Sequence, residues 1–149
     1  MTDAGNAMMA AVPVAPAHLN YLAVLACGAL NFVVGGLWYS GYGFGKAWTK
    51  AAKHRPGKVD SSTMSLLYTG WIAMALLVAL SMGYLLMLTG ASDTRSALRA
   101  AWTVWIGFTV AGSMGDYLAL QRGFKLFAVN MGQHLVTFTL NALILVAWH

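Results

Sequence analysis

The sequence has very few acidic side chains. Among its 149 residues there is no glutamate, and the four aspartates, Asp3, Asp60, Asp93 and Asp116, are far apart. Neighbouring positions therefore offer no pair of carboxylates of the kind that acid–base catalysis and hard-metal sites use. A single cysteine, Cys27, excludes an intramolecular disulfide and a thiolate metal site. We expect no catalytic residue, no metal and no cofactor, and we interpret the protein as something other than an enzyme.

Charge of either sign is scarce as well. Charged residues make up 9% of the chain and apolar residues 59%, whereas a soluble domain carries about 25% charged residues. The long uncharged runs match the roughly 20 residues that a membrane-spanning helix needs, and they lack the alternation of barrel strands. We predict an all-α integral membrane protein with one domain at residues 18–149 after a mobile N-terminal tail at 1–17. Its four transmembrane helices are expected near residues 19–39, 65–89, 98–118 and 125–148.

The basic residues are unevenly distributed between the connections. Seven lie in the first and third connections between the predicted helices: Lys46, Lys50, Lys53, Arg55, Lys58, Arg122 and Lys125. Only two, Arg95 and Arg99, lie near the second connection. Basic loops stay on the cytoplasmic side. We therefore predict a multi-pass protein of the cell (inner) membrane, with both termini outside and loop 40–64 in the cytoplasm. The bias also accounts for the net charge of +5, so we expect no nucleic-acid partner.

A glycine-rich segment, GGLWYSGYGFGKAW at residues 35–48, follows the first predicted helix. A phosphate-binding loop would read G-x-x-x-x-G-K-[ST], but Ser40 replaces its first glycine and Ala47 its hydroxyl residue. The dinucleotide pattern G-x-G-x-x-G fails because Lys46 stands in place of the last glycine. The segment therefore predicts no nucleotide site.

The same segment is typical of a membrane interface. Trp38 and Tyr39 fall at the expected depth of an aromatic belt. After them, apolar side chains recur with helical spacing and lysines occupy the opposite side, which predicts a short amphipathic helix at about residues 44–54 lying on anionic headgroups. The residues assigned to this interface are Trp38, Tyr39, Phe44, Lys46, Trp48, Lys50 and Lys53.

The segment also resembles the signature of a family of small bacterial membrane proteins catalogued as domain of unknown function 1761. The family shows G-x-x-WYS followed by FGK-x-W. WIGF at 105–108 and LFAVNMGQHLV at 126–136 are similar to its third and fourth helices. One departure is Gly41, where the family often has proline. The resemblance implies a four-helix membrane protein and no established activity.

The fourth predicted helix carries a polar face. Asn130, His134, Thr137 and Asn141 are spaced by 4, 3 and 4 residues, with Gln133 beside them. Polar groups in membrane helices usually face the bundle interior. We expect the first and fourth helices to be antiparallel neighbours, with Asn31 close to His134. Two interpretations remain open: hydrogen bonding that fixes helix packing, or a ligand or proton site at His134.

Three classes of function are compatible with this sequence. The first is an accessory or partner-binding membrane subunit, which we favour. The second is an oligomeric transporter or channel with a polar lining around His134. The third is a binder or carrier of an apolar ligand such as a lipid, sterol or tetrapyrrole. The expected partners are the lipid bilayer, together with other membrane proteins or further copies of the chain.

Overall fold

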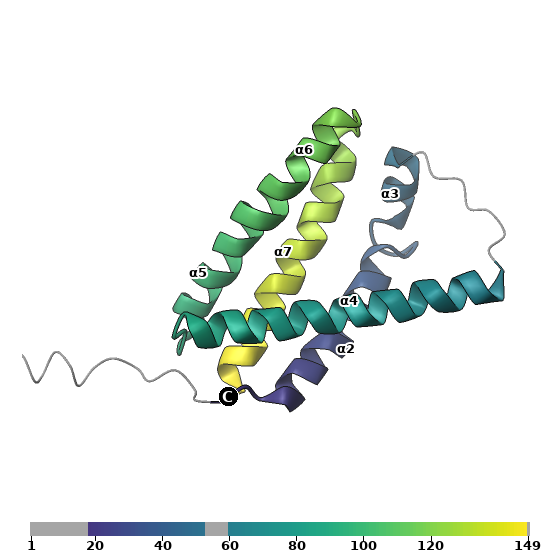
Figure 1. Cartoon of the computed structure of the whole chain (residues 1–149). Coiled ribbons are helices and arrows are strands. Elements are labelled where there is room, and N and C mark those ends of the chain that lie inside the picture. Colours follow the sequence, from purple (N-terminus) through teal and green to yellow (C-terminus); the bar gives the residue numbers. More distant parts are fainter. Residues whose placement is uncertain (1–17, 53–59, 149) are drawn as a thin grey trace, which may run out of the picture.

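The computed structural model describes residues 18–52 and 60–148, which are helical with short connections and contain no strand (Figure 1). The predicted tail at 1–17, residues 53–59 with Lys53, and His149 lie outside the described residues. The helices are α2 (Tyr21–Trp38), α3 (Gly45–Ala51), α4 (Ser61–Leu88), α5 (Thr94–Val104), the π-helix η1 (Trp105–Val110), α6 (Ala111–Ala119) and α7 (Phe124–Ala147).

Three of these helices are long and apolar enough to cross a membrane. They are α2, α4 and α7, and they confirm three of the four predicted segments as helices of sufficient length. The segment predicted at 98–118 is instead divided among α5, η1 and α6, which follow one another without a break in the helical run. The predicted interfacial helix at 44–54 is the shorter α3.

Side-chain caps explain where several helices begin. The Asn20 carboxamide oxygen accepts hydrogen bonds from the amides of Leu22 and Ala23 at the start of α2. Asp93 and Ser96 form a reciprocal capping box at the start of α5. The hydrogen bonds from the Ser96 hydroxyl and amide, foremost among the causes, lower the pKa of the Asp93 carboxyl. These caps satisfy backbone donors that a helix start leaves unpaired.

Two helices end with a residue in the left-handed conformation. Gly90 after α4 has φ 66°, and Gln121 after α6 has φ 51°. In both turns the next residue's amide bonds back to the carbonyl five positions earlier, Ala91 to Leu86 and Arg122 to Tyr117, as in a Schellman motif. Glycine adopts this φ without a steric penalty, whereas glutamine does not.

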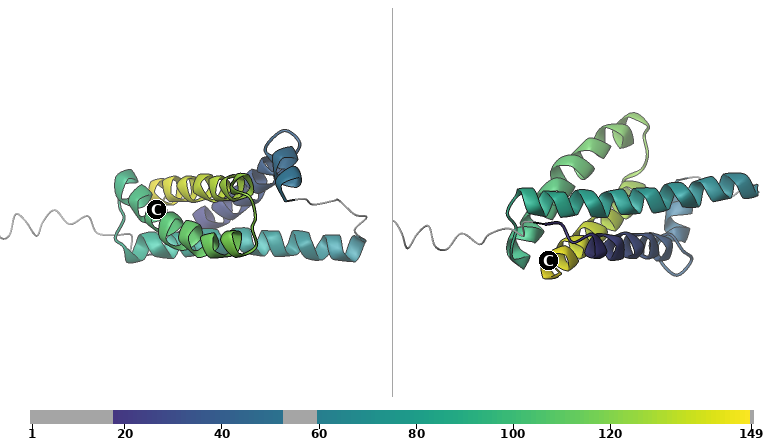
Figure 2. Two further views of the ribbon diagram at one scale, coloured as in Figure 1. Left: turned by 90° about the horizontal axis from the view of Figure 1, so that it is seen from above. Right: turned by 60° about the horizontal axis from the view of Figure 1, so that its bottom comes forward.

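One helix, α4, packs on its neighbours at one end of the molecule and projects away from them at the other. α4 and the α5–η1–α6 segment lie close together where the chain joins them and diverge towards their far ends (Figures 1 and 2). The core consists largely of small residues at the joined end, with Ala23, Cys27, Ala79, Ala97 and Ala142 all fully buried. By contrast, every residue from Ser61 to Met74 in α4 is exposed.

The close approach of α2 to α4 depends on glycine. A Cβ added at Gly28 would lie 2.4 Å from the Leu76 Cδ2 atom and 3.3 Å from the Leu76 Cα atom. One added at Gly83 would lie 2.6 Å from Leu19 Cδ1. Small residues of this kind let membrane helices come into backbone contact. α2 also packs on α7, as predicted for antiparallel neighbours.

Candidate functional site

The polar residues of α7 form a buried column. Gln133, Thr137 and Asn141 recur every four residues and are all buried. The Gln133 Nε2 atom donates a 3.0 Å hydrogen bond to Thr137 Oγ1. Asn141 has no exposed surface, and neither its Oδ1 nor its Nδ2 atom has a partner among the described residues. An unpaired buried amide is costly, so this column is the least satisfied part of the core.

Asn31 belongs to a different contact from the one predicted. Its Nδ2 atom donates to the backbone oxygen of Ala75 in α4 at 3.1 Å, and its buried Oδ1 atom has no partner within residues 18–52 and 60–148. Asn31 and His134, which were predicted to lie close together, share no hydrogen bond. The physical reason is that α2 packs extensively on α4 as well as on α7, and Asn31 bonds to α4.

Asn130 links three helices at the end of the molecule where α7 begins. The Tyr39 hydroxyl donates to Asn130 Oδ1 at 3.0 Å, and Asn130 Nδ2 donates to the Tyr117 hydroxyl of α6. Burial raises the pKa of the Tyr39 phenol to about 12, so this group stays protonated and able to donate. Sequence reasoning missed Tyr117, because nothing in the spacing along α6 identifies its partner on α7.

Three tryptophans donate their indole N–H groups to α7. Trp38 bonds the Val129 carbonyl at 3.0 Å, and Trp105 bonds the Met131 carbonyl at 2.9 Å. Trp102 bonds Thr139 Oγ1 at 3.1 Å. Trp38 is thus a contact between helices as well as an aromatic residue at a helix end. The stretches that carry the family resemblance therefore meet in the fold. They are WYS, WIGF and the AVNM part of LFAVNMGQHLV.

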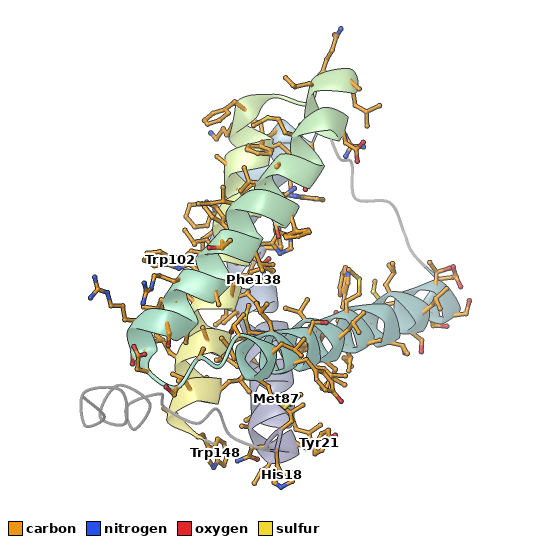
Figure 3. All side chains as sticks on the ribbon, turned by 60° about the vertical axis from the view of Figure 1, so that its left-hand side comes forward. His18, Tyr21, Met87, Trp102, Phe138 and Trp148 are labelled. Carbon is orange, nitrogen blue, oxygen red and sulfur yellow. The ribbon has the colours of Figure 1, made fainter. Side chains whose placement is uncertain are left out.

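His134 lies between the two packed faces of α7. The Val129 carbonyl accepts a hydrogen bond from α2, and the Met131 carbonyl accepts one from η1. Helical spacing places His134 between the side of α7 that faces α2 and the side that faces η1. Its ring lies 6.3 Å from that of Phe138, which Figure 3 places near the divergence of α4 and α5. The imidazole is partly buried and forms no hydrogen bond within the described chain.

The segment before α3 is compact because of two glycines. A Cβ at Gly43 would lie 2.5 Å from the Leu37 carbonyl oxygen, and one at Gly45 would lie 2.2 Å from that of Tyr39. The turn brings the Phe44 ring to 4.6 Å from that of Trp38. The chain therefore turns tightly between α2 and α3.

The predicted interface residues then divide into two groups. The Trp48 and Tyr39 rings meet edge-on, with centroids 5.8 Å apart, so these two aromatic side chains connect α3 to the end of α2. Lys46 and Lys50 are exposed, and α3 lies against α7. The amphipathic character predicted for this stretch is thus reproduced over Gly45–Ala51.

A small cavity lies at the joined end of the helices. His18, Met87 and Trp148, labelled in Figure 3, contribute to its lining. Its volume is about 30 Å³, which suits water molecules and is far below the several hundred Å³ of a typical small-molecule site. Residues 18–52 and 60–148 hold no group of three or more histidine, cysteine or acidic side chains able to bind a metal ion.

The profile of the family described as "Protein of unknown function (DUF1761)" matches residues 22–146. Neither the curated proteins nor the solved structures contain a match. The matched range runs from the first turn of α2 almost to the end of α7, and it includes the tryptophan contacts and the polar column described above. The chain belongs to the DUF1761 family.

Proposed function

We propose that this protein is a four-span protein of the bacterial inner membrane that serves as a partner-binding subunit, with a transmembrane helix of another membrane protein packed on the free half of α4, Ser61–Met74. In this arrangement α5, η1 and α6 together form the fourth span. The uneven distribution of basic residues favours termini outside and loop 40–64 in the cytoplasm. No enzymatic step is part of the proposal.

The observation that carries the proposal is that every residue of the free half of α4 is exposed, although the Tyr68 ring lies 6.4 Å from that of Phe32 in α2. Membrane helices associate through close packing, because lipid tails are as apolar as their side chains. The rest of α4 follows this rule and packs on α2 and α7. The free half contains no charged residue, so its surface fits an uncharged transmembrane helix.

Unpaired polar groups on the free half strengthen this proposal. The hydroxyls of Ser65 and Thr69 and the indole N–H of Trp71 form no hydrogen bond within the described chain. Polar side chains of this type commonly bond across helices in a membrane. His134 of α7 also forms no hydrogen bond within the described chain. A partner helix could satisfy several of these groups together.

The two other classes of function have less support. A carrier of an apolar ligand needs a cavity of several hundred Å³, and the cavity at the joined end is much smaller. A transporter or channel needs a continuous polar path, whereas Gln133, Thr137 and Asn141 are sealed within packed helices. The column still offers unpaired amide atoms at Asn141, which is the specific observation in favour of a transport role.

Native mass spectrometry of the protein extracted from its own membrane in mild detergent tests the proposal. Gly70→Leu and Thr69→Leu project bulk in directions about 100° apart on the free half. A side chain at Gly70 meets nothing within 4 Å, so the isolated chain tolerates it. Gly112→Leu is the matched control, because Gly112 in α6 has equally free surroundings.

We expect a heteromeric complex that persists in Gly112→Leu and is lost in at least one of the α4 variants. A complex that survives both α4 variants, or a wild-type chain that is entirely monomeric, would overturn the proposal. A homodimer that the α4 variants dissociate would replace the foreign partner with a second copy of the chain.

A further inference from the structure

Among the described residues, four cations lie at the end of the molecule that carries α3 and the α6–α7 turn. Lys46 and Lys50 belong to α3, whereas Arg122 and Lys125 belong to the turn and the first turn of α7; all four are exposed. None forms an ion pair with another described residue. Asp116, the acidic residue nearest to Arg122 along the chain, is exposed on α6 and also makes no ion pair with another described residue.

The two pairs of cations belong to elements that pack on each other. α3 packs on α7, and Tyr39 connects the two elements through its ring contact with Trp48 and its hydrogen bond to Asn130. Asn130 follows Lys125 by five residues, about 7.5 Å along the helix. Figure 1 shows α3 and the α6–α7 turn at the same end of the molecule.

Exposed aromatic side chains accompany the cations. Tyr42 is fully exposed and Phe44 is 47% exposed, although both lie in the turn that leads into α3. Aromatic side chains next to lysines form the pattern of a surface that enters the headgroup region of a bilayer. Inorganic phosphate would gain nothing from these rings, whereas a phospholipid would contact the cations through its headgroup and the rings through its apolar part.

We infer that α3 and the α6–α7 turn together form a binding site for the phosphodiester headgroup of an anionic phospholipid, held by Lys46 and Lys50 from one side and by Arg122 and Lys125 from the other. Basic pockets at the cytoplasmic ends of membrane helices bind such headgroups. The site is independent of the free half of α4, so it neither requires nor supports the partner-binding proposal.

The test is lipid retention in native mass spectrometry. The protein is equilibrated with equal amounts of phosphatidylglycerol and phosphatidylcholine of identical acyl chains, and the ratio of the two in the first bound lipid is measured. Variants are the double changes Lys46→Gln/Lys50→Gln and Arg122→Gln/Lys125→Gln. The matched control is Arg95→Gln/Arg99→Gln, which removes two exposed cations near the start of α5.

We expect wild-type protein to prefer phosphatidylglycerol. Lys46→Gln/Lys50→Gln and Arg122→Gln/Lys125→Gln should each reduce that preference about 25-fold, since one cation near the surface contributes about five-fold. The control should retain the wild-type ratio, as should Arg122→Lys/Lys125→Arg, which preserves charge. Because the replaced side chains are exposed, all variants should elute as the wild type in gel filtration.

Three results would overturn the inference. The first is an unchanged ratio of the two lipids in either the Lys46/Lys50 or the Arg122/Lys125 double variant, because the proposed site requires both α3 and the α6–α7 turn. The second is an equal loss in the control, which would indicate a diffuse charge effect. The third is complete loss of the preference when inorganic phosphate or glycerol phosphate is added at the lipid concentration, since the ligand would then be a soluble phosphate.

Discussion

Replacing Gly28 by alanine tests the contact on which the packed end of the fold depends. The added Cβ would lie 2.4 Å from Leu76 Cδ2, which can rotate away, but also 3.3 Å from Leu76 Cα, which cannot. The two helices must therefore move apart by a few tenths of an ångström. Overpacking of this kind costs about 1–3 kcal/mol, and the helical preference of alanine over glycine offsets about 1 kcal/mol of that cost.

Gly36→Ala is the matched control in the same helix. An added Cβ there meets nothing within 4 Å, so only the helix-propensity gain of about 1 kcal/mol remains. The difference between the two variants isolates the steric term. We expect Gly28→Ala to be less stable than Gly36→Ala by about 1–3 kcal/mol.

Cys27 supplies the assay. It is the only cysteine and has no exposed surface, so a thiol-reactive fluorogenic maleimide reports its exposure during heating in detergent. Tryptophan fluorescence provides a second readout at a distance from the substitution. If Gly28→Ala melts at or above the temperature of Gly36→Ala by both readouts, α2 does not contact α4 at Leu76 and the described core is incorrect.

Other predictions follow from helix ends and topology. Gln121→Gly should stabilise the protein by about 1 kcal/mol and Gly90→Ala should destabilise it similarly, because a side chain is strained at positive φ; chemical denaturation measures both. Asp93→Ala should lower the melting temperature at neutral pH. The pKa of this carboxyl is lowered in the fold, so its contribution to stability is present above the ordinary carboxyl pKa and is lost as pH falls through the lowered value. Acid should therefore abolish the difference in melting temperature between Asp93→Ala and the wild type. In a cysteine-free background, membrane-impermeant maleimide should label Gly5→Cys in intact cells and spare Lys58→Cys; labelling of the latter would invert the orientation.

The sequence predicts the helices far better than their arrangement. Uncharged runs of membrane-spanning length locate α2, α4 and α7 because each helix in lipid must satisfy its own backbone. The division of the third segment into α5, η1 and α6 could not be foreseen, since a π-helix depends on local backbone register. The divergence of α4 was equally hidden, because apolar residues facing lipid and apolar residues facing protein look alike in the sequence.

The polar residues illustrate the same limit. Spacing groups Asn130, His134, Thr137 and Asn141 on one face with Gln133 beside it, whereas the buried column consists of Gln133, Thr137 and Asn141. It also indicates that α2 and α7 are neighbours, and they do pack on each other. Spacing cannot choose which polar group on α7 faces which helix. It therefore did not indicate that Asn31 bonds to α4, and it missed the hydrogen bonds that join Tyr39, Asn130 and Tyr117. Hydrogen bonds between helices depend on rotation about each helix axis, and this rotation is set by packing of the whole bundle.

The central claim, that a transmembrane helix of another protein occupies the free half of α4, is tested most directly by photocrosslinking in native membranes. A benzoylphenylalanine at Thr69 should produce a protein adduct whose mass differs from that of a dimer of this 15.9 kDa chain, and the same group at Gly112 should produce none. Adducts at Thr69 that contain only lipid would contradict the claim, because they would show that α4 faces the bilayer alone.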